Sequence, residues 1–315
     1  MIDSQIYYSV KALLYSPADN SKIPDRIISE AFGTAFSLAL CLEDTIRSAY
    51  VEQAEAILVD SIGKIYEAAQ TRKFFIPKIF IRVRRKEQIK DLYRRLGNSA
   101  ELITGFIFPK FSPENADDFI DSTMSCHSRQ PIYMMPILEN HEMINPLKRA
   151  EMLFRIKEKI TPVENHILNI RVGGNDLSGT LGIRRHIDET IYDIRPVANI
   201  FSDIICIFGQ NYVVSAPVWE YYNGDGWDTG LKAEIKADKL MGFFGKTAVH
   251  PRQIPVINEA YTISDKDLDD AKAILNWSDD NNQLVSGNDA KERMNEYNTH
   301  YFWAKKIMYQ YYAKY

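Results

Sequence analysis

Eight short apolar runs, separated by stretches with helical spacing, limit most strongly what this chain can fold into. Apolarity is continuous along each run, which indicates strands buried on both faces, as in a parallel sheet. Between the runs, spacings such as Met152, Leu153, Ile156 and Ile160 place apolar residues on one face of a helix. Eight strands that alternate with helices favour a closed (β/α)8 barrel over an open doubly wound sheet. The runs lie at residues 12–15, 38–42, 74–83, 103–108, 132–138, 167–172, 212–218 and, more weakly, 247–249.

Composition and charge limit the classes of partner and the cellular compartment that we expect for the protein. The 315 residues carry a formal net charge of -4, which argues against nucleic acid or an anionic membrane as the main partner. No apolar run is long enough to cross a bilayer, and the first residues lack the pattern of a signal peptide. The cysteines lie far apart and form no CxxC pair. We therefore expect a soluble protein of the reducing cytoplasm.

The alternation of apolar runs and helical segments ends at about residue 260. We expect a TIM-barrel catalytic domain over residues 1–262 and a C-terminal helical extension over residues 263–315. Ser264, with Asp267 three residues later, resembles a capping box that opens a helix running through Trp277.

A polar stretch at residues 278–283 predicts a loop, and a last helix is expected from about Lys291 to the end of the chain. Its apolar and aromatic positions would pack either on the barrel or on a neighbouring subunit, and the sequence does not separate the two. These positions are Met294, Tyr297, Tyr301, Ile307, Met308 and Tyr311.

Several apolar runs end abruptly in charged residues. In a parallel barrel all strand ends lie on one rim, where active sites of this fold are built. Carboxylates that converge there without a His/Cys cluster are the ligands that a hard cation such as Mg²⁺ requires. A single carboxylate at a strand end often only caps the next helix, but four such positions together favour a functional site. The charged ends are Glu43 and Asp44, Lys110, Glu139 and Asp176, with Arg82 closing another run.

Seven short motifs, in order between about residue 11 and residue 260, resemble those of the HpcH/HpaI aldolase and citrate lyase beta subunit family. Each motif is weak alone, but seven in family order make a specific signal. The resemblance implies a TIM barrel that makes or breaks a carbon–carbon bond. The motifs lie at residues 13–19 (LLYSPAD), 40–45 (LCLEDT), 81–84 (IRVR), 107–110 (IFPK), 137–140 (ILEN), 173–177 (GGNDL) and 245–251 (GKTAVHP).

The same resemblance implies roles for the charged rim. Glu139 and Asp176 would be the direct Mg²⁺ ligands, and Arg82 would grip the substrate carboxylate. Glu43 and Asp44 would lie just behind the ligands. A 2-oxo acid can chelate Mg²⁺ through its carboxylate and keto oxygens, and the metal would then stabilise an enolate. Arginine offers the bidentate fork that a carboxylate needs.

Four further residues are candidates at this site. Tyr15 and Lys246, in the first and last motifs, are expected to contact a cofactor. Lys110 has three alternatives: a Schiff-base lysine, a simple salt bridge or an electrostatic partner of the acidic rim. We favour the last, because surrounding carboxylates keep the amine protonated. For His250 a structural role is favoured over that of a general base.

One region departs from the family pattern. Residues 215–228 lack a clean match to the family's acidic loop, and Asp225 or Asp228 would have to substitute. The divergence resembles a subgroup of C–C bond lyases of the TIM-barrel fold. The glycine pair Gly173–Gly174 belongs to no phosphate-binding motif, and we expect it to let the backbone pass close to metal and substrate.

The leading hypothesis is a Mg²⁺-dependent lyase or aldolase acting on a 2-oxo or 3-hydroxy acid through a metal-stabilised enolate. A coenzyme A thioester is a possible substrate moiety. A condensing enzyme or thioesterase on the same site remains an alternative, as does a catalytically silent barrel that serves as a binding or assembly subunit. The resemblance implies a homo-oligomer, a trimer or a multiple of one.

Overall fold

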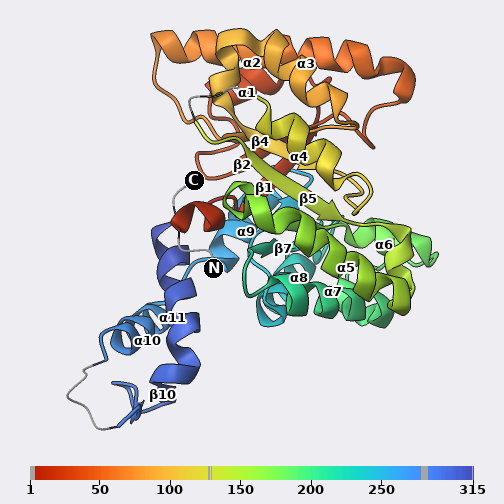
Figure 1. The fold of residues 1–315 in the computed structure, drawn as a ribbon. Helices are drawn as coiled ribbons and strands as arrows, with labels where there is room; N and C mark the ends of the chain where they lie inside the picture. The colour runs from red at the N-terminus through yellow and green to blue at the C-terminus, as the bar shows by residue number, and fades with distance from the viewer. Residues whose placement is uncertain (1–3, 127, 129, 278–282, 314) are drawn as a thin grey trace.

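The structure, a computed structural model, describes residues 4–126, 128, 130–277, 283–313 and 315. Eight parallel strands form a nearly closed barrel that helices surround (Figure 1). All eight apolar runs supply a strand, so the predicted (β/α)8 fold is confirmed. The strands are β1 (Ala12–Pro17), β2 (Ser37–Cys41), β3 (Lys78–Arg82), β4 (Ile103–Phe108), β5 (Tyr133–Leu138), β6 (Ile170–Val172), β7 (Val214–Ser215) and β8 (Lys246–Ala248).

The barrel closes because both ends of the strand series meet. The strands are hydrogen-bonded in the order β7-β6-β5-β4-β3-β2-β1-β8. A parallel bridge between Ala216 and Lys246 then joins the end of β7 to β8. Every carboxyl-terminal strand end therefore lies on the same rim.

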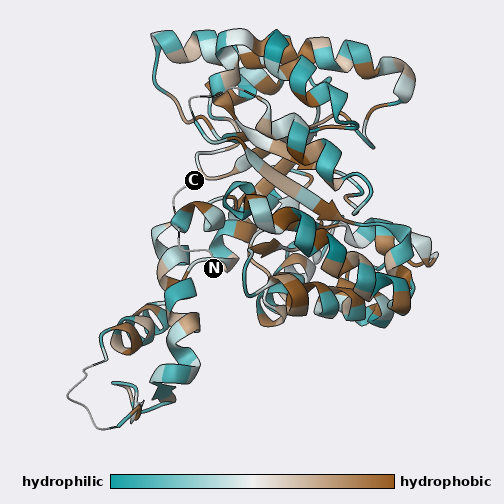
Figure 2. Cartoon of the chain, viewed as in Figure 1, coloured by the Kyte–Doolittle hydropathy of each residue, from teal (hydrophilic) through white to brown (hydrophobic). Residues whose placement is uncertain are grey.

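Helices with one apolar face cover the outside of the barrel. Helix α5 shows how the sequence produces them: the side chain of Asn145 caps its first turn, and Met152, Leu153, Ile156 and Ile160 are buried on the predicted face. Hydrophobic residues concentrate in the strands and on the inner sides of the helices (Figure 2). The helices are α1 (Ile23–Ile28), α2 (Val51–Thr71), α3 (Glu87–Leu96), α4 (Ala116–Met124), α5 (Pro146–Ile160), α6 (Gly174–Thr180), α7 (Arg195–Phe208), α8 (Trp227–Met241) and α9 (Gln253–Ala260).

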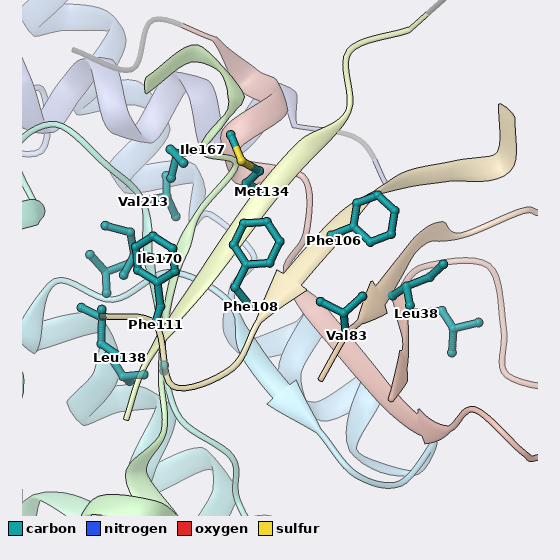
Figure 3. Close-up of a cluster of buried hydrophobic side chains, with 14 of the residues drawn as sticks. Leu38, Val83, Phe106, Phe108, Phe111, Met134, Leu138, Ile167, Ile170 and Val213 are labelled. Carbon is teal, nitrogen blue, oxygen red and sulfur yellow. The ribbon is translucent and has the colours of Figure 1, made fainter. Parts of the chain in front are cut away.

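The strands separate two apolar cores. Side chains that point outward pack under the helices, where Phe108 stacks on Phe119 with ring centroids 4.7 Å apart and lies beside Phe111 (Figure 3). Side chains that point inward fill the barrel itself. The inner core consists of Val10, Leu13, Ala39, Phe80, Ile107, Met135, Ile137 and Leu168.

The C-terminal extension contains two helices, α10 (Asp265–Leu275) and α11 (Tyr297–Tyr312), and a hairpin of β9 (Val285–Gly287) and β10 (Met294–Glu296). Ser264 caps α10 as predicted. The last helix was predicted to start near Lys291, and this is wrong, because residues 294–296 pair antiparallel with residues 285–287. Of the predicted loop at 278–283, residues 278–282 lie outside the described residues.

Helices α10 and α11 project from the barrel and share a small apolar core (Figure 1). Helix α11 reaches the barrel through Tyr309, which stacks on Tyr8 at 6.2 Å, and through Lys306, whose Nζ donates to the carbonyl of Gly209. Tyr311 and Tyr312 remain exposed. The domain boundary and the subunit contact stay predictions. No helix in the described part of the chain has the length and apolarity to span a membrane.

Candidate active site

Charged residues from five consecutive strands, β2 to β6, meet at the carboxyl end of the barrel. These are the charged residues that the sequence placed at the ends of the strands. They meet because the parallel strands of a barrel all end on the same rim. We call this group the barrel mouth. Its members are Glu43 and Asp44 after β2, Arg82 at the end of β3, Lys110 after β4, Glu139 after β5 and Asp176 in the first turn of α6.

Arg82 lies at the centre of the barrel mouth. Its Nη2 is 2.9 Å from Glu43 Oε2, 3.0 Å from Asp44 Oδ2 and 3.2 Å from Glu139 Oε1. The guanidinium is buried, so these pairs are only weakly screened by water. One cation thus holds three carboxylates from two different strand ends in place.

Lys110 binds the same group from the solvent side. Its Nζ is 2.6 Å from Glu43 Oε1 and 3.3 Å from Asp44 Oδ1, and its backbone N–H donates to Glu139 Oε1 at 3.0 Å. Burial opposes its charge, but the pairs with Glu43 and Asp44 outweigh this and raise the pKa of the ammonium group. A protonated, paired lysine supports the electrostatic role over a Schiff-base role.

The two expected metal ligands, Glu139 and Asp176, have carboxyl pKa values above the ordinary range. Burial raises the pKa of the Glu139 carboxyl to about 7, against the opposing charge of Arg82 and with the help of Asp176. Burial and the Asp44 carboxylate raise the pKa of Asp176 as well. Ionising both carboxyls is therefore costly without a further cation beside them.

Gly173 makes room for Glu139. A Cβ on Gly173 would lie 2.4 Å from both Cβ and Oε2 of Glu139. The next residue is packed almost as closely, because a Cβ on Gly174 would lie 2.8 Å from the Cβ of Pro217. The glycine pair thus lets the backbone before α6 pass directly beside a carboxylate, while its expected approach to metal and substrate stays a prediction.

The residues present fit Mg²⁺ with an incomplete protein ligand set. In the described ranges, no group of three or more His, Cys, Asp or Glu side chains is arranged to hold a metal ion. Glu139 and Asp176 would supply two oxygens, and Mg²⁺ ordinarily keeps several waters and binds substrate oxygens at its remaining positions. Two carboxyls with raised pKa values match this pattern.

A family model for the C–C bond lyases of the TIM-barrel fold matches residues 4–313. The chain belongs to this family. Its members are carbon–carbon lyases, so the protein is an enzyme of that class.

Named relatives agree with this family at lower similarity. A segment of 48 residues is 40% identical to L-malyl-CoA/beta-methylmalyl-CoA lyase of Cereibacter sphaeroides, and it covers 15% of this chain and 15% of that protein. CitE of Mycobacterium tuberculosis, solved with magnesium, acetoacetate and coenzyme A, superposes with a TM-score of 0.62 at 20% identity, over 97% of this chain and 99% of that one. RipC of Yersinia pestis superposes with a TM-score of 0.57 at 17% identity, over 83% and 99%. These structures share the fold of the lyase.

Lys246 of the lyase is not at the barrel mouth, and the expectation that it contacts a cofactor is wrong. It is fully buried on the outer face of β8, with Nζ 2.9 Å from Glu234 and 2.7 Å from Asp238. Arg185 pairs with Glu234 at 3.1 Å, and the Tyr192 hydroxyl donates to Asp238 at 2.6 Å. Lys246 is therefore part of a buried network that ties β8 to α8.

Replacing Lys246 with methionine is expected to destabilise the lyase by about 3 kcal/mol, because Asp238 would lose its cation while buried. Mg²⁺ affinity should stay within about twofold, since the network lies outside the barrel mouth. Urea unfolding and calorimetry measure the two quantities. The control is Lys236→Met, because Lys236 is an exposed lysine of α8, the helix that carries Glu234 and Asp238. A stable Lys246→Met variant that had lost ligand binding would restore the cofactor role.

The other predicted residues have distinct positions. Tyr15 points into the barrel beside Arg171 and is half-buried, while its cofactor contact stays a prediction. Asp228 lies in the first turn of α8, and no ion pair joins it to Arg82 or Lys110 in the described part of the chain. His250 stacks on Tyr222 at 4.6 Å and its Nδ1 accepts the backbone N–H of Arg252. That geometry suits the structural role expected for His250.

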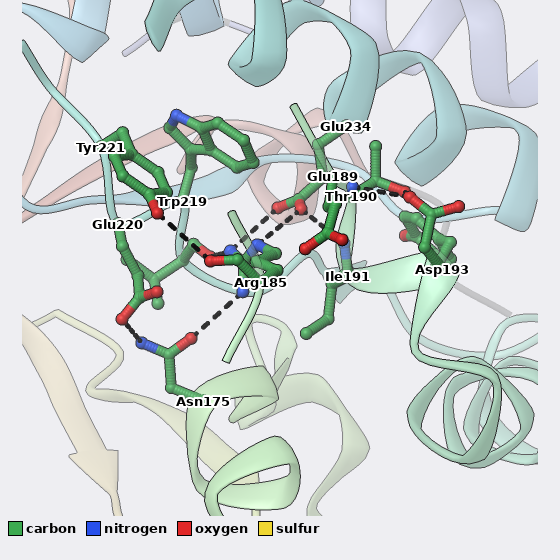
Figure 4. Close-up of polar contacts among 12 residues, drawn as sticks. Asn175, Arg185, Glu189, Thr190, Ile191, Asp193, Trp219, Glu220, Tyr221 and Glu234 are labelled. Carbon is green, nitrogen blue, oxygen red and sulfur yellow. Dashed lines mark hydrogen bonds and ion pairs between the residues drawn. The ribbon is translucent and has the colours of Figure 1, made fainter. Parts of the chain in front are cut away.

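Arg185, which sequence reasoning missed, organises the loop where the lyase departs from its family. Its guanidinium contacts Asn175 Oδ1 at 3.3 Å, the carbonyl of Val218 at 2.5 Å and Glu234 at 3.1 Å (Figure 4). Asn175 precedes the expected ligand Asp176. Arg185 thus connects the start of α6 to the loop after β7 and to α8, although nothing in its own sequence context marks it.

Arg171, also missed, lies inside the barrel on β6. Its Nη2 donates to Thr247 Oγ1 at 2.6 Å, and its Nη1 lies 3.5 Å from Asn169 Oδ1. A single arginine between apolar Ile170 and Val172 was the signal that could have found it, because a charge within a buried strand requires a reason.

Proposed function

We propose that this lyase binds Mg²⁺ through Glu139 and Asp176 and cleaves or forms a carbon–carbon bond of a 2-oxo or 3-hydroxy acid. One observation carries the proposal: two carboxyls with raised pKa values lie at the barrel mouth, beside a glycine whose missing side chain leaves space for one of them. Binding of a divalent cation is favourable at such a site, because the cation stabilises the two ionised carboxylates.

Each residue of the barrel mouth has a separate role in the proposed reaction. Bound at Glu139 and Asp176, Mg²⁺ would stabilise the negative charge that develops on the carbonyl oxygen as the neighbouring bond breaks. Arg82 fixes Glu139 from one side, and the backbone N–H of Lys110 fixes the same Oε1. Glu43 and Asp44 hold Arg82 and Lys110 in turn. The carboxylates are thus preorganised before substrate binds.

The molecules bound in two similar structures suggest the chemical class of the substrate. Citrate lyase beta subunit of M. tuberculosis was solved with oxaloacetate and magnesium, and superposes with a TM-score of 0.55 at 21% identity over 82% of this chain and all of that one. CitE was solved with magnesium, acetoacetate and coenzyme A. We propose a short oxo acid as the metal-bound substrate, with an acyl-CoA as the second substrate moiety.

Calorimetry with wild-type lyase tests the proposal. Oxaloacetate or pyruvate is titrated with and without Mg²⁺, followed by product analysis with acyl-CoA partners. We expect binding of the 2-oxo acid only when Mg²⁺ is present, and products that contain a new or broken carbon–carbon bond. Absence of metal-dependent binding in the wild type would refute the proposed site, and hydrolysis of a thioester without carbon–carbon bond change would refute the proposed reaction.

A further inference from the structure

Among the described residues of the lyase, one buried cation lacks an anionic partner. The described residues contain five buried side chains of arginine or lysine, and four of them pair with a carboxylate. Arg171, only 2% exposed, has no carboxylate within 4 Å in this part of the chain. Arginine stays charged in proteins, so an unpaired buried guanidinium is costly unless a ligand supplies the anion. The four paired cations are Arg82, Arg149, Arg185 and Lys246.

The position of Arg171 points to the ligand of the barrel mouth. In the strand register Arg171 lies level with Ile137 of β5 and Ser215 of β7, two residues before Gly173. It therefore points into the barrel from the strand next to β5, one layer of side chains below Glu139. Its hydrogen-bond partner Thr247, on β8, is partly exposed.

A count of charges gives the sign of the missing partner. The barrel mouth holds four carboxylates against Arg82 and Lys110, and Arg171 adds a third cation beneath them. A bound divalent cation would leave one positive charge in excess in a region of low dielectric, and the substrate carboxylate that chelates the metal would neutralise it. A second carboxylate is therefore favoured only where it pairs directly with a cation that has no other anion. Arg82 already contacts three carboxylates, whereas the fork of Arg171 has only neutral partners. Arg171 is thus the better placed group for a substrate anion.

We propose that Arg171 binds a second carboxylate of the substrate and makes the lyase selective for 2-oxo dicarboxylic acids over 2-oxo monocarboxylic acids. The inference rests on the proposed function, because it assumes that the 2-oxo acid end is held at Glu139 and Asp176. Gly173 and Arg171 lie two residues apart on the chain, which corresponds to about 7 Å between their Cα atoms in a strand. This spacing of one layer of side chains is on the scale of a short dicarboxylate, so the strand geometry is compatible with one carboxylate at the metal and one at the guanidinium.

Calorimetry of Arg171→Met with Mg²⁺ tests the assignment, because methionine keeps the buried stem and removes the charge. The wild type should bind oxaloacetate more tightly than pyruvate. In the variant, oxaloacetate affinity should fall about 30-fold while pyruvate affinity and Mg²⁺ affinity change less than threefold. The melting temperature should not decrease, since an unpaired charge is removed. Arg171→Lys, which keeps the charge without the fork, should lose less oxaloacetate affinity.

The outcomes separate this inference from the proposed function. If the wild type binds both acids with Mg²⁺ and Arg171→Met keeps the preference for oxaloacetate, the selectivity role is wrong and the metal site stands. A variant that melts lower and weakens both acids equally would show a merely structural arginine and overturn the assignment. If the wild type binds neither acid with Mg²⁺, the proposed function fails and this inference fails with it.

Discussion

Replacing Glu139 with glutamine is expected to stabilise the metal-free lyase at pH 8 by about 3 kcal/mol and to abolish Mg²⁺-dependent ligand binding. Burial raises the pKa of the carboxyl from 4.5 to about 7. Each unit of pKa shift corresponds to about 1.4 kcal/mol, and the side chain is nearly inaccessible to screening water. Glutamine removes the buried charge but also removes a metal ligand.

The pH dependence has a defined sign. The folded protein holds the Glu139 proton more tightly than the unfolded chain does, so wild-type stability falls as pH rises from about 4.5 to about 7. Above that range the full penalty remains. The glutamine variant should lack this part of the slope. Mg²⁺ should restore wild-type stability at pH 8, by about 2.7 kcal/mol at a hundredfold excess over its dissociation constant.

Urea unfolding at pH 5 and pH 8, with and without Mg²⁺, measures these effects. Glu142→Gln is the matched control, because Glu142 lies three residues further along and is exposed, so its stability should change less than about 0.5 kcal/mol. A Glu139→Gln variant that is less stable than the wild type at pH 8, or that still gains stability from Mg²⁺, would contradict the electrostatic account.

Apolar runs predicted where strands occur but overstated their length. The run at 74–83 supplies only β3 (Lys78–Arg82), because Phe75 packs its ring near Phe36 at 5.7 Å without joining the strand ladder. Continuous apolarity reports burial, and burial has other causes than pairing in a sheet. The β9–β10 hairpin was missed for the opposite reason: the residues of β9 are all exposed and carry no apolar pattern.

The barrel mouth was predictable because strand ends converge whatever the details of packing. The direction of a side chain within a strand was not, since neighbouring residues point to opposite faces. Lys246 belongs to the last motif yet points outward, level with Ala12 of the outer core, while Thr247 points inward, level with Leu13. Arg171 was overlooked inside an apolar run because only the structure shows that its partners carry no charge.

Replacing Gly173 with alanine is expected to lower Mg²⁺ affinity about 100-fold, since displacing a preorganised group by an ångström costs roughly this much. The added Cβ would lie 2.4 Å from Glu139 Oε2, so the carboxylate or the start of α6 must move. We expect an accompanying loss of about 2 kcal/mol in the free energy of unfolding from overpacking. Calorimetry with Mg²⁺ and urea unfolding measure the two effects.

Gly179→Ala is the matched control, because Gly179 lies in the same helix α6 and nothing lies within 4 Å of its Cβ position. Alanine has the higher helix propensity, so this variant should be as stable as the wild type or more stable, by up to about 1 kcal/mol, with unchanged Mg²⁺ affinity. Equal Mg²⁺ affinities in Gly173→Ala and Gly179→Ala would show that Glu139 is not a metal ligand, since a ligand cannot leave its position without cost to the metal. A loss of Mg²⁺ affinity in Gly173→Ala alone would show that metal binding by Glu139 requires the absence of a side chain at Gly173.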